Sequence, residues 1–190
     1  MAPVTEVTLR DGSVVSVRPL ETGESGPLRE IFEGMGEESR YLRFLAPMPE
    51  IDERGLAQLA DIDHHHHEAL LALADERAVG VARFVRSDAD PEAAEVAVTV
   101  ADEWQGRGLG HELLELLTER AREEGIRRYL ALVSAENRRM RGLLEEAGAP
   151  PAGPARNGQV EYAFDLPHAG LGETLRRALR AVRSWHVSLR

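Results

Sequence analysis

The sequence predicts a single mixed α/β domain followed by a short helical extension. Strand-like and helix-like apolar patterns alternate along the chain, in the order ββ-ααα-βββ-α-β-α-β. A glycine-rich turn at residues 105–110 separates a β-branched strand from a long helix with leucines at helical spacing. At 190 residues, the chain is long enough for one domain with a full core.

The first half of the chain contains two predicted hairpins that flank three helices. Apolar and polar residues alternate on either side of Asp11-Gly12, a strong hairpin signal. Asp52 is a suitable N-cap for the third helix. The second hairpin turns at residues 75–77. The expected elements are strands at 4–9 and 14–18, helices at 28–35, 39–45 and 52–60, and strands at 69–74 and 78–85.

The second half begins with the central strand and the glycine-rich turn. Gly125 and Gly148 are expected to end two of its helices. The expected elements are a strand at 95–100, a helix at 107–124, a strand at 129–133, a helix at 137–147 and a strand at 160–166. A domain spanning residues 4–166 therefore accounts for all the strands.

Residues 167–190 form a predicted C-terminal helical extension. Its apolar residues fall at spacings of three and four: Leu171, Leu175, Leu179, Val182 and Trp185. A surface helix usually buries such a stripe on its own domain, and we expect this here. A contact between two copies of the chain in a homodimer is the alternative.

The glycine-rich turn has the properties of a phosphate-binding loop. Its three glycines let the backbone approach a ligand closely, and the helix that follows begins with unpaired N–H groups and a partial positive charge. A P-loop is excluded because the chain contains no lysine. A dinucleotide fingerprint fits poorly because His111 takes the place of its third glycine. We expect Arg107 to add a local positive charge for an anionic ligand.

Composition excludes several other classes of protein. The net charge of −10 argues against general nucleic-acid binding, and no apolar run is long enough to span a membrane. The absence of cysteine rules out disulfides and thiolate chemistry and, with no export signal visible, suits a cytoplasmic protein. Residues 64–67 are consecutive histidines, whose side chains point to different sides. We expect them to form a solvated turn and expect no metal site.

The turn and two further segments resemble a known family. The Gln-x-x-Gly-x-Gly pattern of residues 105–110 resembles the acetyl-CoA pyrophosphate loop of the GCN5-related N-acetyltransferase (GNAT) superfamily. Residues 94–97 (Ala-Glu-Val-Ala) and 39–44 (Ser-Arg-Tyr-Leu-Arg-Phe) are similar to segments of the bacterial Pat-type protein lysine acetyltransferases. The resemblance implies the GNAT fold, a mixed central sheet of about seven strands with flanking helices, here with an extra C-terminal helix.

The resemblance also implies which residues contact acetyl-CoA, the expected acyl donor. The pyrophosphate would lie on the loop, and the pantetheine arm would pair with backbone N–H groups of the preceding strand. The implied contacts are Val98, Val100, Gln105, Gly106, Arg107, Gly108, Leu109, Gly110, Asn137 and Arg139. Many relatives place a tyrosine, the general acid for the thiolate, where this chain has Leu144.

Glu95 is the expected catalytic residue. Acetyl transfer to an amine needs a base for the amine proton. Glu95 heads an otherwise apolar strand and shares a face with Ala97 and Thr99, so we expect it to be partly withdrawn from water, which strengthens a carboxylate as a base. From the residues alone, a strand-edge charge pointing to solvent is an equal alternative. The resemblance favours the first, because the catalytic glutamate of Pat-type enzymes occupies this place.

The sequence thus predicts an acetyl-CoA-dependent N-acetyltransferase that acts by direct attack on a lysine amine of a cytoplasmic protein. The resemblance suggests acyl-CoA synthetases as acceptors. Acetylation of a small amine, such as a polyamine, amino acid or aminoglycoside, is a second hypothesis. A non-catalytic acyl-CoA-binding module is a third. Glu95 distinguishes the enzymes from the binding module, because only an enzyme needs it.

Overall fold

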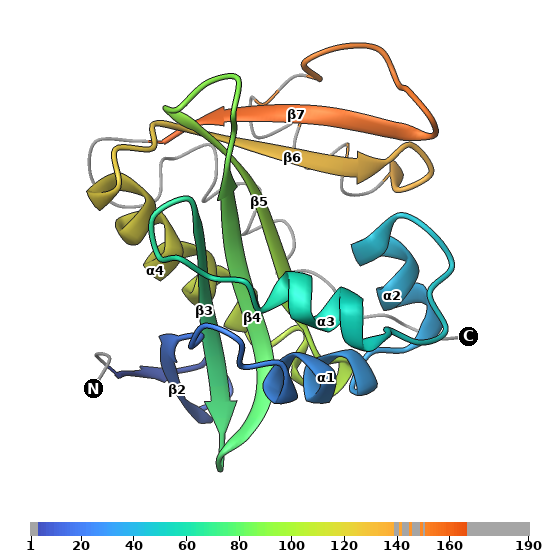
Figure 1. Ribbon diagram of the computed structural model, residues 1–190. Coiled ribbons are helices and arrows are strands. Elements are labelled where there is room, and N and C mark those ends of the chain that lie inside the picture. Colours follow the sequence, from blue (N-terminus) through green and yellow to red (C-terminus); the bar gives the residue numbers. More distant parts are fainter. Residues whose placement is uncertain (1–3, 139–140, 142–144, 146–148, 150, 167–190) are drawn as a thin grey trace.

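The computed structural model describes residues 4–138, 141, 145, 149 and 151–166, whose strands form one seven-stranded sheet in sequential order. Neighbouring strands are antiparallel except β5 and β6, which are parallel. The mixed sheet confirms the predicted fold class (Figure 1). The strands are β1 (Thr5–Thr8), β2 (Val14–Pro19), β3 (His67–Ala74), β4 (Arg77–Arg86), β5 (Ala93–Val100), β6 (Arg128–Ser134) and β7 (Gln159–Asp165).

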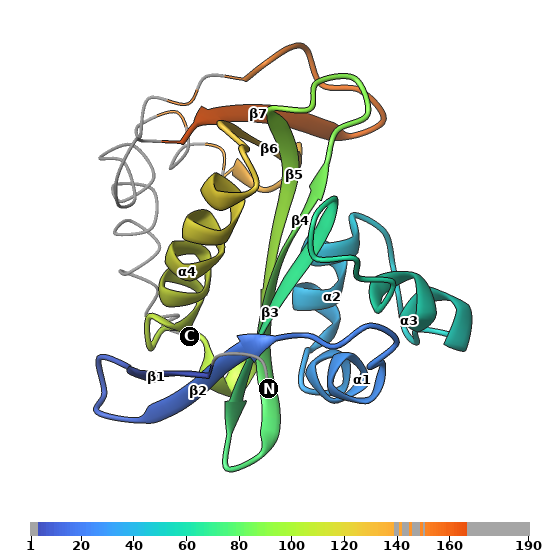
Figure 2. The same ribbon diagram turned by 60° about the vertical axis from the view of Figure 1, so that its left-hand side comes forward.

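Helices cover both faces of the sheet. Figure 2 shows α4 on one face and α1, α2 and α3 on the other. Their bounds are α1 (Gly26–Glu33), α2 (Glu37–Phe44), α3 (Glu53–Leu59) and α4 (Leu109–Glu123). A short 3₁₀ turn, η1 (Asp102–Trp104), follows β5 and was not predicted. None of the helices in the described part of the chain has the length and apolarity needed to cross a membrane.

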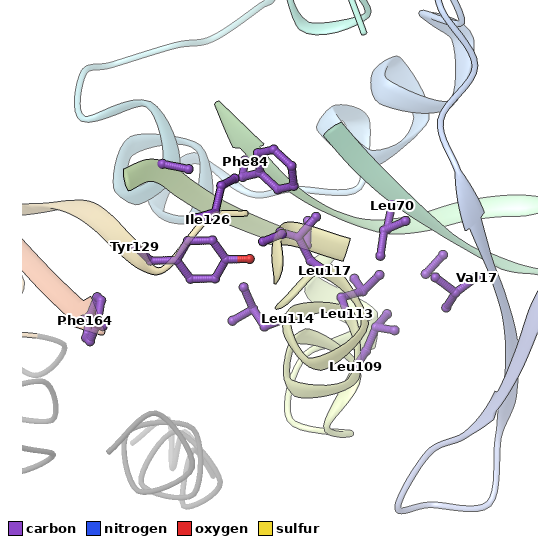
Figure 3. Packing of buried hydrophobic residues seen from close by; sticks show 14 of the residues in the cluster. Val17, Leu70, Phe84, Leu109, Leu113, Leu114, Leu117, Ile126, Tyr129 and Phe164 are labelled. Carbon is purple, nitrogen blue, oxygen red and sulfur yellow. The ribbon is translucent and has the colours of Figure 1, made fainter. Parts of the chain in front are cut away.

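Two apolar clusters hold the layers together. On one face, leucines of α4 pack against side chains of the sheet that include Phe84 and Tyr129 (Figure 3). On the other, Ile31 of α1 and Leu56 of α3 are buried in a cluster with Leu71 of β3. The period of each pattern decides which residues face the core, because helical residues three or four apart share a face and strand residues do so at every second position.

Local sequence signals placed most element ends within about two residues. Asp52 caps α3 as predicted, since its Oδ1 accepts the Gly55 N–H at 2.7 Å. One difference is the start of α4, which begins at Leu109 rather than at residue 107. Gly106 and Gly108 have φ of +76° and +94°, which a right-handed helix excludes. Residues 138, 141 and 145 of the helix predicted at 137–147 are helical, and the predicted extension at 167–190 lies outside the described residues.

The histidine run is a turn whose side chains go to separate partners. Asp63 Oδ1 accepts the backbone N–H groups of His65, His66 and His67 at 2.7–2.9 Å. His67 is the first residue of β3, two positions earlier than predicted. The Nδ1 atom of His64 bonds the Glu68 carboxylate at 2.9 Å. The Nδ1 atoms of the other three histidines each bond a different residue. The described residues contain no cluster of metal-binding side chains.

Candidate active site

The site begins where β5 and β6 part. These strands pair over only three residues of each, ending at Glu95 opposite Leu130, whereas β5 stays paired with β4 as far as Val100 (Figure 1). The N–H of Ala101 donates to the carbonyl of Val79 at 3.0 Å. Because alternate residues of a strand turn to opposite edges, the N–H groups of Val98 and Val100 are directed away from β4 and toward the gap. A ligand in the gap can therefore pair with the edge of β5.

A cavity of about 570 Å³ lies at this gap. Its walls come from β5, β6, the glycine-rich turn and α2. Most of the residues predicted to bind or react line it, namely Glu95, Val98, Val100, Gln105, Gly106, Gly108, Leu109, Gly110 and Asn137. Arg107 does not line it, and Arg139 and Leu144 lie outside the described residues.

The glycine-rich turn forms the end of the cavity next to α4. Gly108 is the N-cap of α4 in the left-handed conformation, and its carbonyl accepts the N–H groups of His111 and Glu112 at 3.0 and 3.2 Å. The N–H groups of Leu109 and Gly110, the first two helical residues, have no preceding helical carbonyl to donate to. The side-chain amide of Gln105 holds the turn in place by donating to Val100 O at 3.1 Å, Ser39 Oγ at 3.2 Å and Asp102 Oδ1 at 2.9 Å. Gln105 thus fixes the turn relative to β5 and α2. The result is a rigid set of donors suited to an anion.

Contrary to the prediction, Arg107 does not line the cavity. Its Nη1 pairs with Asp11 Oδ2 at 3.0 Å, its Nε and Nη2 donate to the carbonyl of Glu103, and its Cζ lies 4.6 Å from the centre of the Trp104 ring. Arg10, from the turn between β1 and β2, lines this end of the cavity. Sequence reasoning missed Arg10 because its proximity to the loop is a contact between segments far apart in the chain.

Glu95 lines the opposite part of the cavity. Its register opposite Val85 and Leu130 puts it on the same face of β5 as Ala97 and Thr99, as predicted. The predicted withdrawal of this carboxylate from water is wrong, because Glu95 is exposed. The reason is the parting of β5 and β6, which opens this stretch of β5 to the cavity. Substrates that fill the cavity would therefore also shield the carboxylate.

Two arginines lie near Glu95 on the face of the sheet that α1–α3 cover. Arg43 of α2 donates from Nε to Thr99 Oγ1 at 2.9 Å, and Arg83 of β4 is buried opposite Ala97. Burial lowers the pKa of both guanidiniums, to about 10 for Arg83, while the negative charge of Glu95 opposes that shift. Both remain cationic at neutral pH. The acidic group of this site thus lies in a locally positive environment.

The Arg83 guanidinium is held by two residues that do not line the cavity. Its Nη2 donates to the carbonyl of Leu59 at 3.0 Å and contacts His67 Nε2. Burial, followed by the nearby Arg83 charge, lowers the pKa of His67 below its ordinary value. Sequence reasoning placed His67 in a solvated turn and assigned no role to Arg83, because the pattern of β4 shows Arg83 merely as a charged residue within an apolar strand.

Asn137 follows β6 at the edge of the cavity. Its backbone N–H donates to Ser134 O at 3.0 Å and its carbonyl accepts from Arg141 N at 3.1 Å. It lines the same cavity as the glycine-rich turn. The structure therefore brings together residues from β5, the turn and the segment after β6, as the resemblance implied.

Comparison with known proteins agrees with this fold. The sequence profile of the acetyltransferase (GNAT) family matches residues 30–149. The chain is 36% identical over 140 residues to Acetyltransferase PA5475 of Pseudomonas aeruginosa, a match that covers 72% of this chain and 75% of that protein. It is 32% identical over 152 residues to Acetyltransferase Pat of Mycolicibacterium smegmatis, covering 75% of this chain but 43% of that longer protein.

Solved structures show the same fold. The GNAT domain of S. lividans PAT superposes with a TM-score of 0.77 and 32% identity, covering 86% of this chain and 97% of that one. YncA of Salmonella typhimurium, whose structure includes acetyl-CoA, superposes with a TM-score of 0.60 at 20% identity, covering 82% and 95%. The chain belongs to the GNAT family of acetyltransferases and is an N-acetyltransferase.

Proposed function

We propose that this enzyme transfers the acetyl group of acetyl-CoA to the side-chain amine of a lysine in another protein, with Glu95 as general base. The observation that carries the proposal is the cavity itself. It joins an anion-binding turn at the start of α4 to a carboxylate at the point where β5 and β6 part. A donor bound along β5 would therefore place its phosphates at the turn and its reactive thioester near the carboxylate.

The chain's own residues are suited to hold the donor. The turn at residues 105–110 offers backbone N–H groups and the positive end of the α4 dipole to the pyrophosphate. The outward N–H groups of Val98 and Val100 offer donors to the amide carbonyls of the pantetheine arm. Val98 N–H is also the proposed donor to the thioester oxygen, on which negative charge develops.

The proposed reaction is a direct attack of the amine on the thioester. The amine nitrogen forms a bond to the carbonyl carbon, and the C–S bond then breaks to release the CoA thiolate. The lysine ammonium loses two protons in forming the amide. Glu95 accepts the first before the attack and passes it to solvent, and the second leaves the nitrogen after the attack and reaches the thiolate through Glu95 or water. A base is needed because a lysine amine, with a pKa of about 10.4, is almost entirely protonated at pH 7.

A lysine acceptor is supported by the similarity to the Pat proteins and by the lining of the cavity near Glu95. Leu42, Phe44 and Leu132 line the cavity together with Glu95. Such a lining suits the methylene stem of lysine, which covers apolar surface while its amine reaches a polar partner. The acceptor we propose is a cytoplasmic protein, with an acyl-CoA synthetase as the first to test.

The test supplies acceptors of different classes with labelled acetyl-CoA. A purified acyl-CoA synthetase, a polyamine, an amino acid and an aminoglycoside are incubated with the enzyme, and mass spectrometry locates the label. Labelled lysine that disappears with Glu95→Gln supports the proposal. If only the small amines carry label, the acceptor is a small amine and not a protein lysine. If the protein binds CoA but labels none of the acceptors, the binding module is favoured.

A further inference from the structure

The turn between β1 and β2 is joined to the glycine-rich turn by two contacts. The backbone N–H of Arg10 donates to the carbonyl of Arg107 at 3.2 Å. In the other direction, the Arg107 side chain pairs with Asp11 at 3.0 Å. Asp11 is itself ordered by its neighbour, because its Oδ1 accepts both the N–H and the hydroxyl of Ser13. The tip of the first hairpin is therefore fixed against the start of α4.

The Arg10 side chain lies directly against Gly108. A Cβ added to Gly108 would lie 2.9 Å from Arg10 Nε and 3.2 Å from Arg10 Cζ. The φ of Gly108, +94°, already disfavours any other residue there. Glycine at this position therefore permits both the shape of the turn and the close approach of a guanidinium. Arg10 lines the cavity, whereas Arg107 does not.

The two arginines at this end of the cavity thus have different surroundings. The Arg107 guanidinium bonds Asp11 and the Glu103 carbonyl and contacts the Trp104 ring, and these partners hold it outside the cavity. The Arg10 guanidinium lies against Gly108, and Arg10 lines the cavity. A pyrophosphate carries more negative charge than the helix dipole alone balances, and a guanidinium is the side chain best suited to phosphate oxygens.

We propose that Arg10 binds the pyrophosphate of the acyl donor, which makes the N-terminal hairpin part of the coenzyme site. Arg107 is then a positioning residue that fixes this hairpin through Asp11. The inference rests on the proposed donor, a CoA thioester, and is independent of the acceptor. It follows that Arg10 discriminates between donors that carry the phosphates and donors that end at pantetheine.

The test measures binding of CoA and of pantetheine, which lacks phosphates, by calorimetry in the absence of acceptor. Arg10→Ala should weaken CoA binding by about tenfold, the lower range for a charge-assisted contact at an exposed residue, and leave pantetheine binding unchanged. Arg10→Lys should restore part of the CoA affinity as a point charge. The difference between wild type and Arg10→Ala should shrink as salt is raised.

Arg18→Ala serves as the matched control, because Arg18 pairs with Glu24 and does not line the cavity. Melting temperatures show whether each variant is folded. Unchanged CoA binding by a folded Arg10→Ala variant, or an equal loss for CoA and pantetheine, would overturn the proposal. If the wild-type protein fails to bind CoA, the proposal that the donor is a CoA thioester is contradicted as well. Arg10-dependent CoA binding without lysine acetylation would contradict the proposed function alone.

Discussion

Glu95 lies opposite Leu130 in the last paired position of β5 and β6. The backbone of Glu95 is therefore fixed by neighbours on both sides, whereas the next residues of β5 have β4 alone as a strand partner. This relationship gives the proposed base a rigid position at the mouth of a gap. A rigid position is what general-base catalysis requires, since proton transfer depends on hydrogen-bond geometry.

Replacing Glu95 tests its proposed role as the base. Glu95→Gln should lower kcat by roughly 10²–10⁴-fold at neutral pH, the usual range for a positioned base, and keep CoA affinity. The remaining rate should rise toward alkaline pH, because the fraction of neutral lysine amine increases. Initial rates over a pH series and CoA calorimetry provide the measurement. Full activity of Glu95→Gln at pH 7 would show that another group takes the proton.

The same substitution at Glu161 provides the control for that experiment. Glu161 is an exposed residue of β7 that does not line the cavity. Glu161→Gln should leave kcat and CoA affinity unchanged, because it alters charge without altering the site.

Gly108→Asp tests the anion site at the start of α4. The new side chain adds negative charge where the pyrophosphate is expected and meets the Arg10 guanidinium. CoA affinity should fall more than about tenfold. Gly125→Asp is the matched control, because Gly125 has a similar φ of +80° and no atom within 4 Å of an added Cβ. Equal CoA affinities for the two folded variants in calorimetry would exclude this turn as the phosphate site.

Arg120 should stabilise the fold through the buried Glu68 carboxylate. Glu68 is 1% exposed, accepts from Arg120 Nε at 3.3 Å and bonds His64 at 2.9 Å. Arg120→Leu leaves a buried charge without its guanidinium, so unfolding free energy should fall by about 3 kcal/mol. Combining it with Glu68→Leu should recover much of the loss.

Thermal melting measures this effect, with an expected drop in Tm of roughly 6–12 °C for Arg120→Leu. Arg127 offers the control, because its pair with Glu92 is 64% exposed on both sides. Arg127→Leu should cost less than about 1 kcal/mol. If the two variants lose similar amounts of unfolding free energy, the burial of Glu68 does not determine the size of the effect.

Glu24 should make part of the stability depend on pH. Hydrogen bonds from Arg18, at 2.6 and 2.8 Å, hold the pKa of Glu24 below its ordinary value. A lowered folded-state pKa adds stability above the unfolded pKa of about 4.3, and this stability is lost as pH falls through the folded value. Glu24→Gln should therefore be less stable by about 1 kcal/mol at pH 7.

Urea unfolding of wild type and Glu24→Gln at several pH values checks this expectation. The difference between them should be constant from pH 7 to about 5 and narrow below about 4. A difference that stays constant into the acid range would show that the Glu24 charge is not its cause.

The sequence by itself determined the order of the strands and helices in the described part of the chain and the location of the glycine-rich turn. These features depend on local patterns. Apolar periodicity selects helix or strand, and the spacing of Gly106, Gly108 and Gly110 sets the turn. The placement of Glu95 on one face with Ala97 and Thr99 is local as well, because strand residues alternate.

The tertiary structure alone decided which side chains meet. Arg107 pairs with Asp11 across 96 positions of the chain, and Arg43 reaches Thr99 across 56. The parting of β5 and β6 exposes Glu95, which its apolar neighbours suggested would be shielded. No local pattern contains this information, because exposure and partners depend on how distant segments pack. For the same physical reason, the sequence could not show that Arg10 lines the cavity and that Arg107 does not.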